Sequence, residues 1–141
     1  MRRAFALVVL ACATAAAGAS AAPALRQCSA RSIGPGSSLD GGTTGAACVL
    51  AAFRSGCKPA EYVLSSFGVD TAATEDFRVE RRAGRCDVVV ITSFRVIPQA
   101  ARVFKPQTCR RVRKVKADIV ADRCTAGPPG QPAAVSLTVL R

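Results

Sequence analysis

The chain has 141 residues, of which 20 are lysine or arginine, 9 are acidic and none is histidine, so its formal net charge at pH 7 is +11. The absence of histidine excludes Ser-His-Asp and Cys-His catalysis and removes the commonest protein ligand for metal ions. The positive charge favours attraction to anionic surfaces and polymers.

The first residues predict an export signal. Arg2 and Arg3 precede an apolar stretch over residues 4–17, and residues 18–21 read Gly-Ala-Ser-Ala. A charged start, an apolar stretch and an A-x-A-like site are typical of a cleavable signal peptide, and the stretch is shorter than the roughly 20 residues of a membrane-spanning helix. We therefore expect residues 1–21 to be a signal peptide and the mature protein to be secreted or periplasmic, with no transmembrane segment.

A lipoprotein anchored through Cys12 is the alternative. The sequence Val9-Leu10-Ala11-Cys12 would then be the processing site. Because Leu10 fits poorly just before the small residue of such a site, we favour the cleavable signal peptide.

Six cysteines remain after residues 1–21 are removed, namely Cys28, Cys48, Cys57, Cys86, Cys109 and Cys124. An even number of cysteines in a chain bound for an oxidising compartment predicts three disulfides. A zinc cluster is not expected, because the sequence has no Cys-x-x-Cys pair and no histidine. We expect neither a metal site nor a cofactor.

Residues 22–45 are expected to be an irregular lead-in. Residues 34–38 read Gly-Pro-Gly-Ser-Ser and residues 41–44 read Gly-Gly-Thr-Thr, which is typical of loops. Cys28 would tie this segment to the rest of the chain. Residues 46–141 have the length of a single small domain with one core.

A helix is predicted from Ala46 to Ser55, because apolar side chains recur at helical spacing around Val49 and Phe53. Thr43 or Thr44 can cap its start, and the glycine that follows Ser55 marks its end.

After the helix the apolar pattern changes to a period of two. This pattern predicts strands over residues 61–67, 77–81 and 86–97. Residues 68–71 and 83–84 are the turns between them.

The hairpin around residues 83–84 has a specific expected register. Setting the turn there pairs Val79 with Val88 and Phe77 with Val90, and it places all four side chains on one buried face. The Val-Val-Val-Ile run that begins at Val88 is apolar on both faces of its strand, which predicts a position in the middle of the sheet.

Residues 109–124 are expected to form a second hairpin, centred on residues 116–117, that brings Cys109 opposite Cys124 for a disulfide. The alternative is one straight strand with these cysteines roughly 50 Å apart, because Lys-Ala is an unusual hairpin turn. Residues 135–139 alternate as a final edge strand.

One helix followed by four or five strands predicts an α+β domain, with the N-terminal helix packed on a mainly antiparallel sheet and three disulfides joining the elements. Helix geometry restricts the disulfide partners. Cys48 within the helix and Cys57 beyond its end would lie roughly 12 Å apart, so each is expected to pair with another cysteine.

The strongest local feature is basic. Residues 95–116 contain eight lysines and arginines and no acidic residue. The candidate anion-binding residues are the five in the second hairpin, Arg110, Arg111, Arg113, Lys114 and Lys116. In an extended strand Arg111 and Arg113 point to one side and the other three to the opposite side. We favour the interpretation that this segment is an edge strand kept soluble by its charge. The alternative is that its side chains bind phosphate or sulfate oxygens.

Asp70, Glu75 and Asp76 are an acidic cluster between the expected strands. Two carboxylates across a cleft can supply acid and base chemistry. Proximity in sequence provides neither the required separation nor a raised pKa, so we expect a solvated turn and no catalytic residue.

These features favour a non-catalytic exported domain over an enzyme. It would bind an anionic envelope or extracellular component, such as an anionic polymer or an acidic protein, through its basic residues. The alternative is a protein–protein interaction module, such as an inhibitor or a host-directed secreted factor, with binding loops on a rigid disulfide scaffold.

Overall fold

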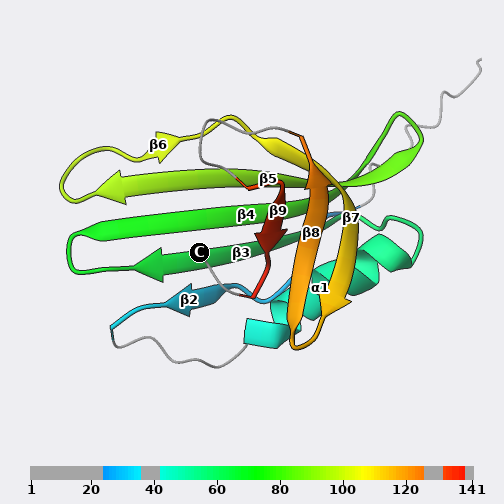
Figure 1. Ribbon diagram of the computed structural model, residues 1–141, viewed down its shortest axis with the longest axis horizontal. Coiled ribbons are helices and arrows are strands. Elements are labelled where there is room, and N and C mark those ends of the chain that lie inside the picture. The colour runs from blue at the N-terminus through cyan, green and yellow to red at the C-terminus, as the bar shows by residue number, and fades with distance from the viewer. Residues whose placement is uncertain (1–23, 36–41, 126–131, 139–141) are drawn as a thin grey trace, which may run out of the picture.

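The computed structural model describes residues 24–35, 42–125 and 132–138, which form one helix and nine strands (Figure 1). The elements are β1 (Arg26–Gln27), β2 (Arg31–Ile33), α1 (Gly42–Arg54), β3 (Ala60–Phe67), β4 (Thr71–Arg82), β5 (Arg85–Val96), β6 (Arg102–Val103), β7 (Gln107–Val115), β8 (Asp118–Cys124) and β9 (Ala134–Ser136). The expected signal peptide and the alternative lipid anchor at Cys12 lie outside the described residues. Within those residues, no helix is long and apolar enough to cross a membrane.

The architecture is a helix on a large mixed sheet. The predicted α+β class is confirmed, whereas the predicted size of four to five strands is wrong. The strand order is β1-β3-β4-β5-β7-β8-β9, with β2 also paired to β3 and β6 to β5. Two of the additional strands, β1 and β2, lie in the segment expected to be irregular, and they pair in parallel with the edge of β3.

The predicted helix is confirmed, and it begins one turn earlier than expected. Because α1 starts at Gly42, Thr43 and Thr44 lie inside its first turn and do not precede it as caps. Packing explains the earlier start, since Ala46 and Val49 are fully buried against the sheet and stabilise the first turns.

Gly45 allows α1 to approach the sheet closely. A Cβ at this position would collide with the carbonyl oxygen of Ser29 and with the ring of Tyr62. Tyr62 is fully buried on β3 and stacks on Phe77 of β4, with ring centroids 5.9 Å apart. The contact between helix and sheet therefore depends on a position without a side chain.

The first hairpin has the predicted register. Val79 pairs with Val88 and Phe77 with Val90, and all four side chains are at most 1 % exposed. The strand β4 is longer than predicted. Residues 71–76 are largely polar, but they pair with β3 on one side and with β5 on the other.

The second hairpin is also confirmed, with β7 and β8 joined at residues 116–117 and Cys109 opposite Cys124. Lys116 adopts a positive φ of 56°, so it supplies the left-handed conformation that such a turn usually obtains from glycine or asparagine. The final strand β9 pairs with β8, and the buried side chains of Val135 and Leu137 extend the core.

The three disulfides are Cys28–Cys48, Cys57–Cys86 and Cys109–Cys124. The first joins the segment after β1 to α1, the second joins the end of α1 to β5, and the third crosses the second hairpin. As predicted from helix geometry, Cys48 and Cys57 do not pair with each other.

We expect Gly45→Ala to destabilise the protein. At an ordinary helix position alanine is more favourable than glycine by about 1 kcal/mol. Here the added methyl group would push α1 away from Tyr62 and the Ser29 carbonyl, so the free energy of unfolding should fall by about 1 to 2 kcal/mol in urea denaturation. Ala47→Gly, at an exposed position of α1, is the control and should lose about 1 kcal/mol. A stabilised Gly45→Ala variant would contradict the close approach.

Candidate functional site

The five candidate anion-binding residues are exposed and lie along one hairpin: Arg110, Arg111, Arg113 and Lys114 in β7, and Lys116 in the turn to β8. Arg111 and Arg113 share one side of the strand, because both contact Asp122. Arg110 and Lys114 occupy the alternate positions and therefore lie on the other side. The five cations do not form a single patch.

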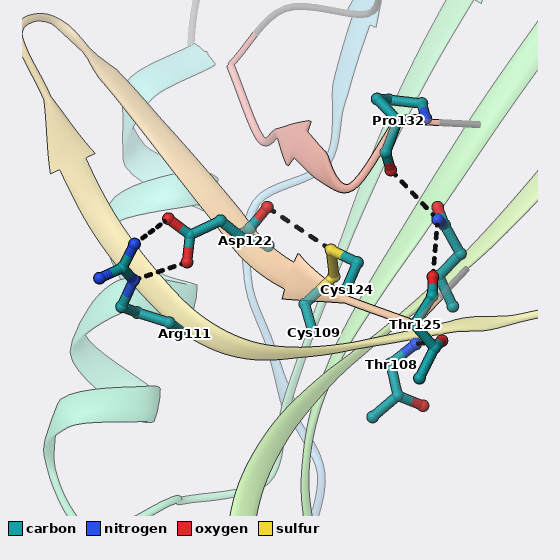
Figure 2. Close-up of a disulfide and its surroundings, with 9 residues drawn as sticks. Thr108, Cys109, Arg111, Asp122, Cys124, Thr125 and Pro132 are labelled. Atoms are coloured by element: carbon teal, nitrogen blue, oxygen red, sulfur yellow. Dashed lines mark hydrogen bonds and ion pairs between the residues drawn. A yellow bond between two sulfur atoms is a disulfide. The ribbon is translucent and has the colours of Figure 1, made fainter. Parts of the chain in front are cut away.

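A carboxylate on β8 holds two of these arginines together. Asp122 lies opposite Arg111, and its oxygens accept hydrogen bonds from Arg111 Nε and Nη2 (2.6 and 2.7 Å) and from Arg113 Nε (2.6 Å). Figure 2 shows the Arg111–Asp122 contacts beside the Cys109–Cys124 disulfide. We refer to Asp122, Arg111 and Arg113 as the arginine clamp.

The clamp has a buried anion and two exposed cations. The side chain of Asp122 is 8 % exposed, whereas those of Arg111 and Arg113 are 46 % and 49 % exposed. Hydrogen bonds, first from Arg111 and then from Arg113, lower the pKa of Asp122 to about 2. The carboxylate therefore stays ionised at neutral pH, and the clamp carries a net charge of +1.

Several guanidinium donors in the clamp are available to a ligand. Asp122 engages Nε and Nη2 of Arg111 and Nε of Arg113. Among the described residues, the bonds to Asp122 leave Arg111 Nη1 and both Nη atoms of Arg113 unused. The clamp thus combines fixed side chains with exposed donors, which is the arrangement that an oxyanion can bind.

Sequence reasoning missed Asp122, although the expected hairpin contained the signal. A hairpin with Cys109 opposite Cys124 places residue 122 opposite residue 111. An arginine facing a carboxylate across two strands is a favourable pair. The expected register, applied to charged residues as well as cysteines, would have found it.

The acidic cluster is not a single site. Asp70 lies in the turn before β4, whereas Glu75 and Asp76 are consecutive in β4 and point to opposite faces. Asp76 pairs with Arg78 (Oδ2–Nη2 2.6 Å), and Arg78 also contacts Glu61 (Nε–Oε1 2.9 Å). The expected solvated turn is wrong for Glu75 and Asp76, because β4 begins before them. The described residues contain no group of three or more cysteines and acidic side chains that could hold a metal ion.

Glu75 is a largely buried acid on the face of the sheet that α1 covers further along. Its neighbours in register are Leu64 on β3 and Thr92 on β5. Its Oε2 atom is buried without a hydrogen-bond partner in the described part of the chain, and burial raises the pKa of Glu75 from 4.5 to about 7. Neither neighbour in register has a titratable side chain.

The raised pKa of Glu75 should make stability depend on pH. Its ordinary pKa of 4.5 applies to the unfolded chain and a value of about 7 to the folded protein, so the folded state binds more protons between these pH values. Stability should therefore be greatest at the acidic end and fall as the pH rises to about 7, by about 3 kcal/mol in total.

Glu75→Gln is neutral at every pH and should remove this part of the pH dependence. Urea midpoints of the two proteins between pH 4.5 and pH 8 would measure the effect. An unchanged pH dependence in Glu75→Gln would show that Glu75 is not the group responsible.

No protein-family model matches the chain. No curated protein and no solved structure shows significant similarity to it either. The function must therefore be argued from the geometry of its own residues.

Proposed function

We propose that the chain is an exported, non-catalytic domain that binds an anionic polymer of the cell envelope or the extracellular space. The observation that best supports this function is the arginine clamp, in which buried Asp122 holds Arg111 and Arg113 side by side. Sulfate or phosphate groups of the polymer would accept hydrogen bonds from the remaining Nη donors.

Preorganisation distinguishes the clamp from the other candidate cations of the second hairpin. A free arginine or lysine side chain loses conformational freedom when it binds a ligand, and this loss weakens binding. Arg111 and Arg113 are already restrained through their Nε atoms. Arg110 and Lys114 have no comparable restraint among the described contacts, so the clamp is the stronger candidate.

The other cations contribute attraction at a distance. Arg110 and Lys114 lie on the opposite side of β7, and Lys116 lies in the turn. Physiological salt screens exposed charges beyond about 8 Å, so these residues would assist the approach of a polymer more than its final binding.

The disulfides support the proposed location. Three disulfides in a small domain are typical of oxidising compartments. The signal peptide expected at residues 1–21 would deliver the chain there. In the alternative, a lipid at Cys12 would retain it at the envelope. Both destinations contain anionic polymers.

Binding to heparin, a sulfated polymer, would test the role of the clamp. The double variant Arg111→Lys/Arg113→Lys keeps both charges beside Asp122 but removes the planar guanidinium groups, so it should bind about tenfold more weakly at physiological salt. The matched double variant Arg110→Gln/Lys114→Gln removes two charges from the other side of β7 and should bind less than about threefold more weakly. Titration at several salt concentrations would measure both affinities.

The two double variants separate the clamp from a simple effect of net charge. If loss of two charges weakens binding more than the charge-conserving change, the proposal is wrong. Thermal unfolding would verify that both variants fold. A saturable protein partner whose binding does not respond to salt would favour the alternative, a protein–protein interaction module.

A further inference from the structure

Exposed apolar side chains gather at one end of the sheet. Seven large apolar side chains are exposed among the described residues. Six of them form what we call the apolar end: Phe67, Val69, Phe94, Val96, Ile97 and Val103. The seventh, Leu25, precedes β1, which pairs with the opposite end of β3. A cluster of this kind marks an interaction site more often than isolated apolar residues do.

Strand register brings the apolar end together. Val96 pairs with Thr71, and the backbone N–H of Ile97 donates to the carbonyl oxygen of Asp70 (2.8 Å). The turn after β3 and the segment after β5 therefore lie side by side. In Figure 1 the ends of β3, β4 and β5 beside β6 extend beyond α1 and the β7–β8 hairpin.

The apolar end is exposed on both faces and at its extremity. Strand alternation places Phe94 and Val96 on the face that α1 covers elsewhere, and Val103, which pairs with Ser93, on the other face. Val69 and Ile97 lie beyond the strands, and Val69 is 89 % exposed. A protein partner typically covers one face, whereas the outer layer of a bilayer surrounds an inserted end on all sides.

Two arginines lie just behind the extremity. Arg95 is next to Val96, and Arg102 pairs with Phe94. At a strand rise of about 3.3 Å per residue, Arg95 and Arg102 lie about 7 to 10 Å behind Ile97 along the strand. This distance is close to the depth to which interfacial segments insert their apolar side chains. Asp70 is the one acidic residue within residues 66–74 and 92–106, so the local charge favours anionic head groups.

We propose that the apolar end inserts into the outer layer of an anionic lipid bilayer, with Arg95 and Arg102 contacting lipid phosphates. This activity goes beyond polymer binding, because the apolar end and the arginine clamp share no residue. A domain with both surfaces would join an anionic polymer to a membrane.

Co-sedimentation with vesicles tests the proposal. The wild-type protein and every variant are recovered after export and prepared in the same way. Anionic vesicles contain phosphatidylcholine with phosphatidylglycerol, and neutral vesicles contain phosphatidylcholine alone. The wild-type protein should bind the anionic vesicles. Val69→Ser/Ile97→Ser should weaken this binding at least about tenfold, and Arg95→Gln/Arg102→Gln should weaken it about 25-fold, with little effect on binding to phosphatidylcholine alone.

Matched controls identify the surface. Leu25→Ser removes an exposed apolar side chain from the other end of the sheet, and Arg110→Gln/Lys114→Gln removes two cations from β7. Each control should change vesicle binding less than about threefold. Arg111→Lys/Arg113→Lys should leave vesicle binding unchanged, so failure of the clamp and failure of the apolar end can be distinguished.

A fluorescent reporter gives an independent readout, because the chain contains no tryptophan. The emission of Val69→Trp should shift to shorter wavelength with anionic vesicles, whereas that of Leu25→Trp should not. Absence of vesicle binding, or equal losses in Leu25→Ser and Val69→Ser/Ile97→Ser, would overturn the proposal. Self-association that depends on Val69 and Ile97 in the absence of vesicle binding would also overturn it and assign the surface to a protein contact.

Discussion

The pairing of β4 with β5 is the constraint on which the rest of the structure depends. Its register turns Phe77, Val79, Val88 and Val90 toward α1, and a slip of one residue would turn all four to the opposite face. The second hairpin joins the sheet through this pairing as well, because Cys109 lies opposite Val88. The β4–β5 register thus makes one face of the sheet apolar, and α1 and the second hairpin pack against that face.

The elements that can be predicted from sequence are those with a local signal. The helix and the two hairpins carry their own apolar period or turn, so their positions and the register of Val79 with Val88 follow from the sequence. The strands β1 and β2 are two and three residues long and have no apolar pattern of their own. They are strands because they pair with β3, so the local sequence does not predict them. Residues 71–76 are similar, because pairing on both sides makes them a strand.

The surfaces of the domain are harder to predict because they depend on what covers each residue. The basic residues of β7 are evident in the sequence, but the role of Asp122 requires a partner across the hairpin. Val96 and Val88 occupy the same face of β5, yet Val88 is fully buried and Val96 is 40 % exposed. The positions of α1 and of the second hairpin distinguish them, because β7 pairs with β5 at Val88 and not at Val96. No local pattern contains that information.

All three disulfides lie in the part of the domain that α1 covers. The backbone N–H of Cys28 donates to the carbonyl oxygen of Glu61, near the start of β3. Cys86 is near the start of β5, and Cys109 lies opposite Val88. In the described residues, no disulfide reaches the far ends of β3, β4 and β5. The disulfides and the apolar end therefore lie in separate regions, so substitutions in the apolar end need not disturb the packing of the cross-linked core. New binding preferences could evolve on this domain without a change of fold.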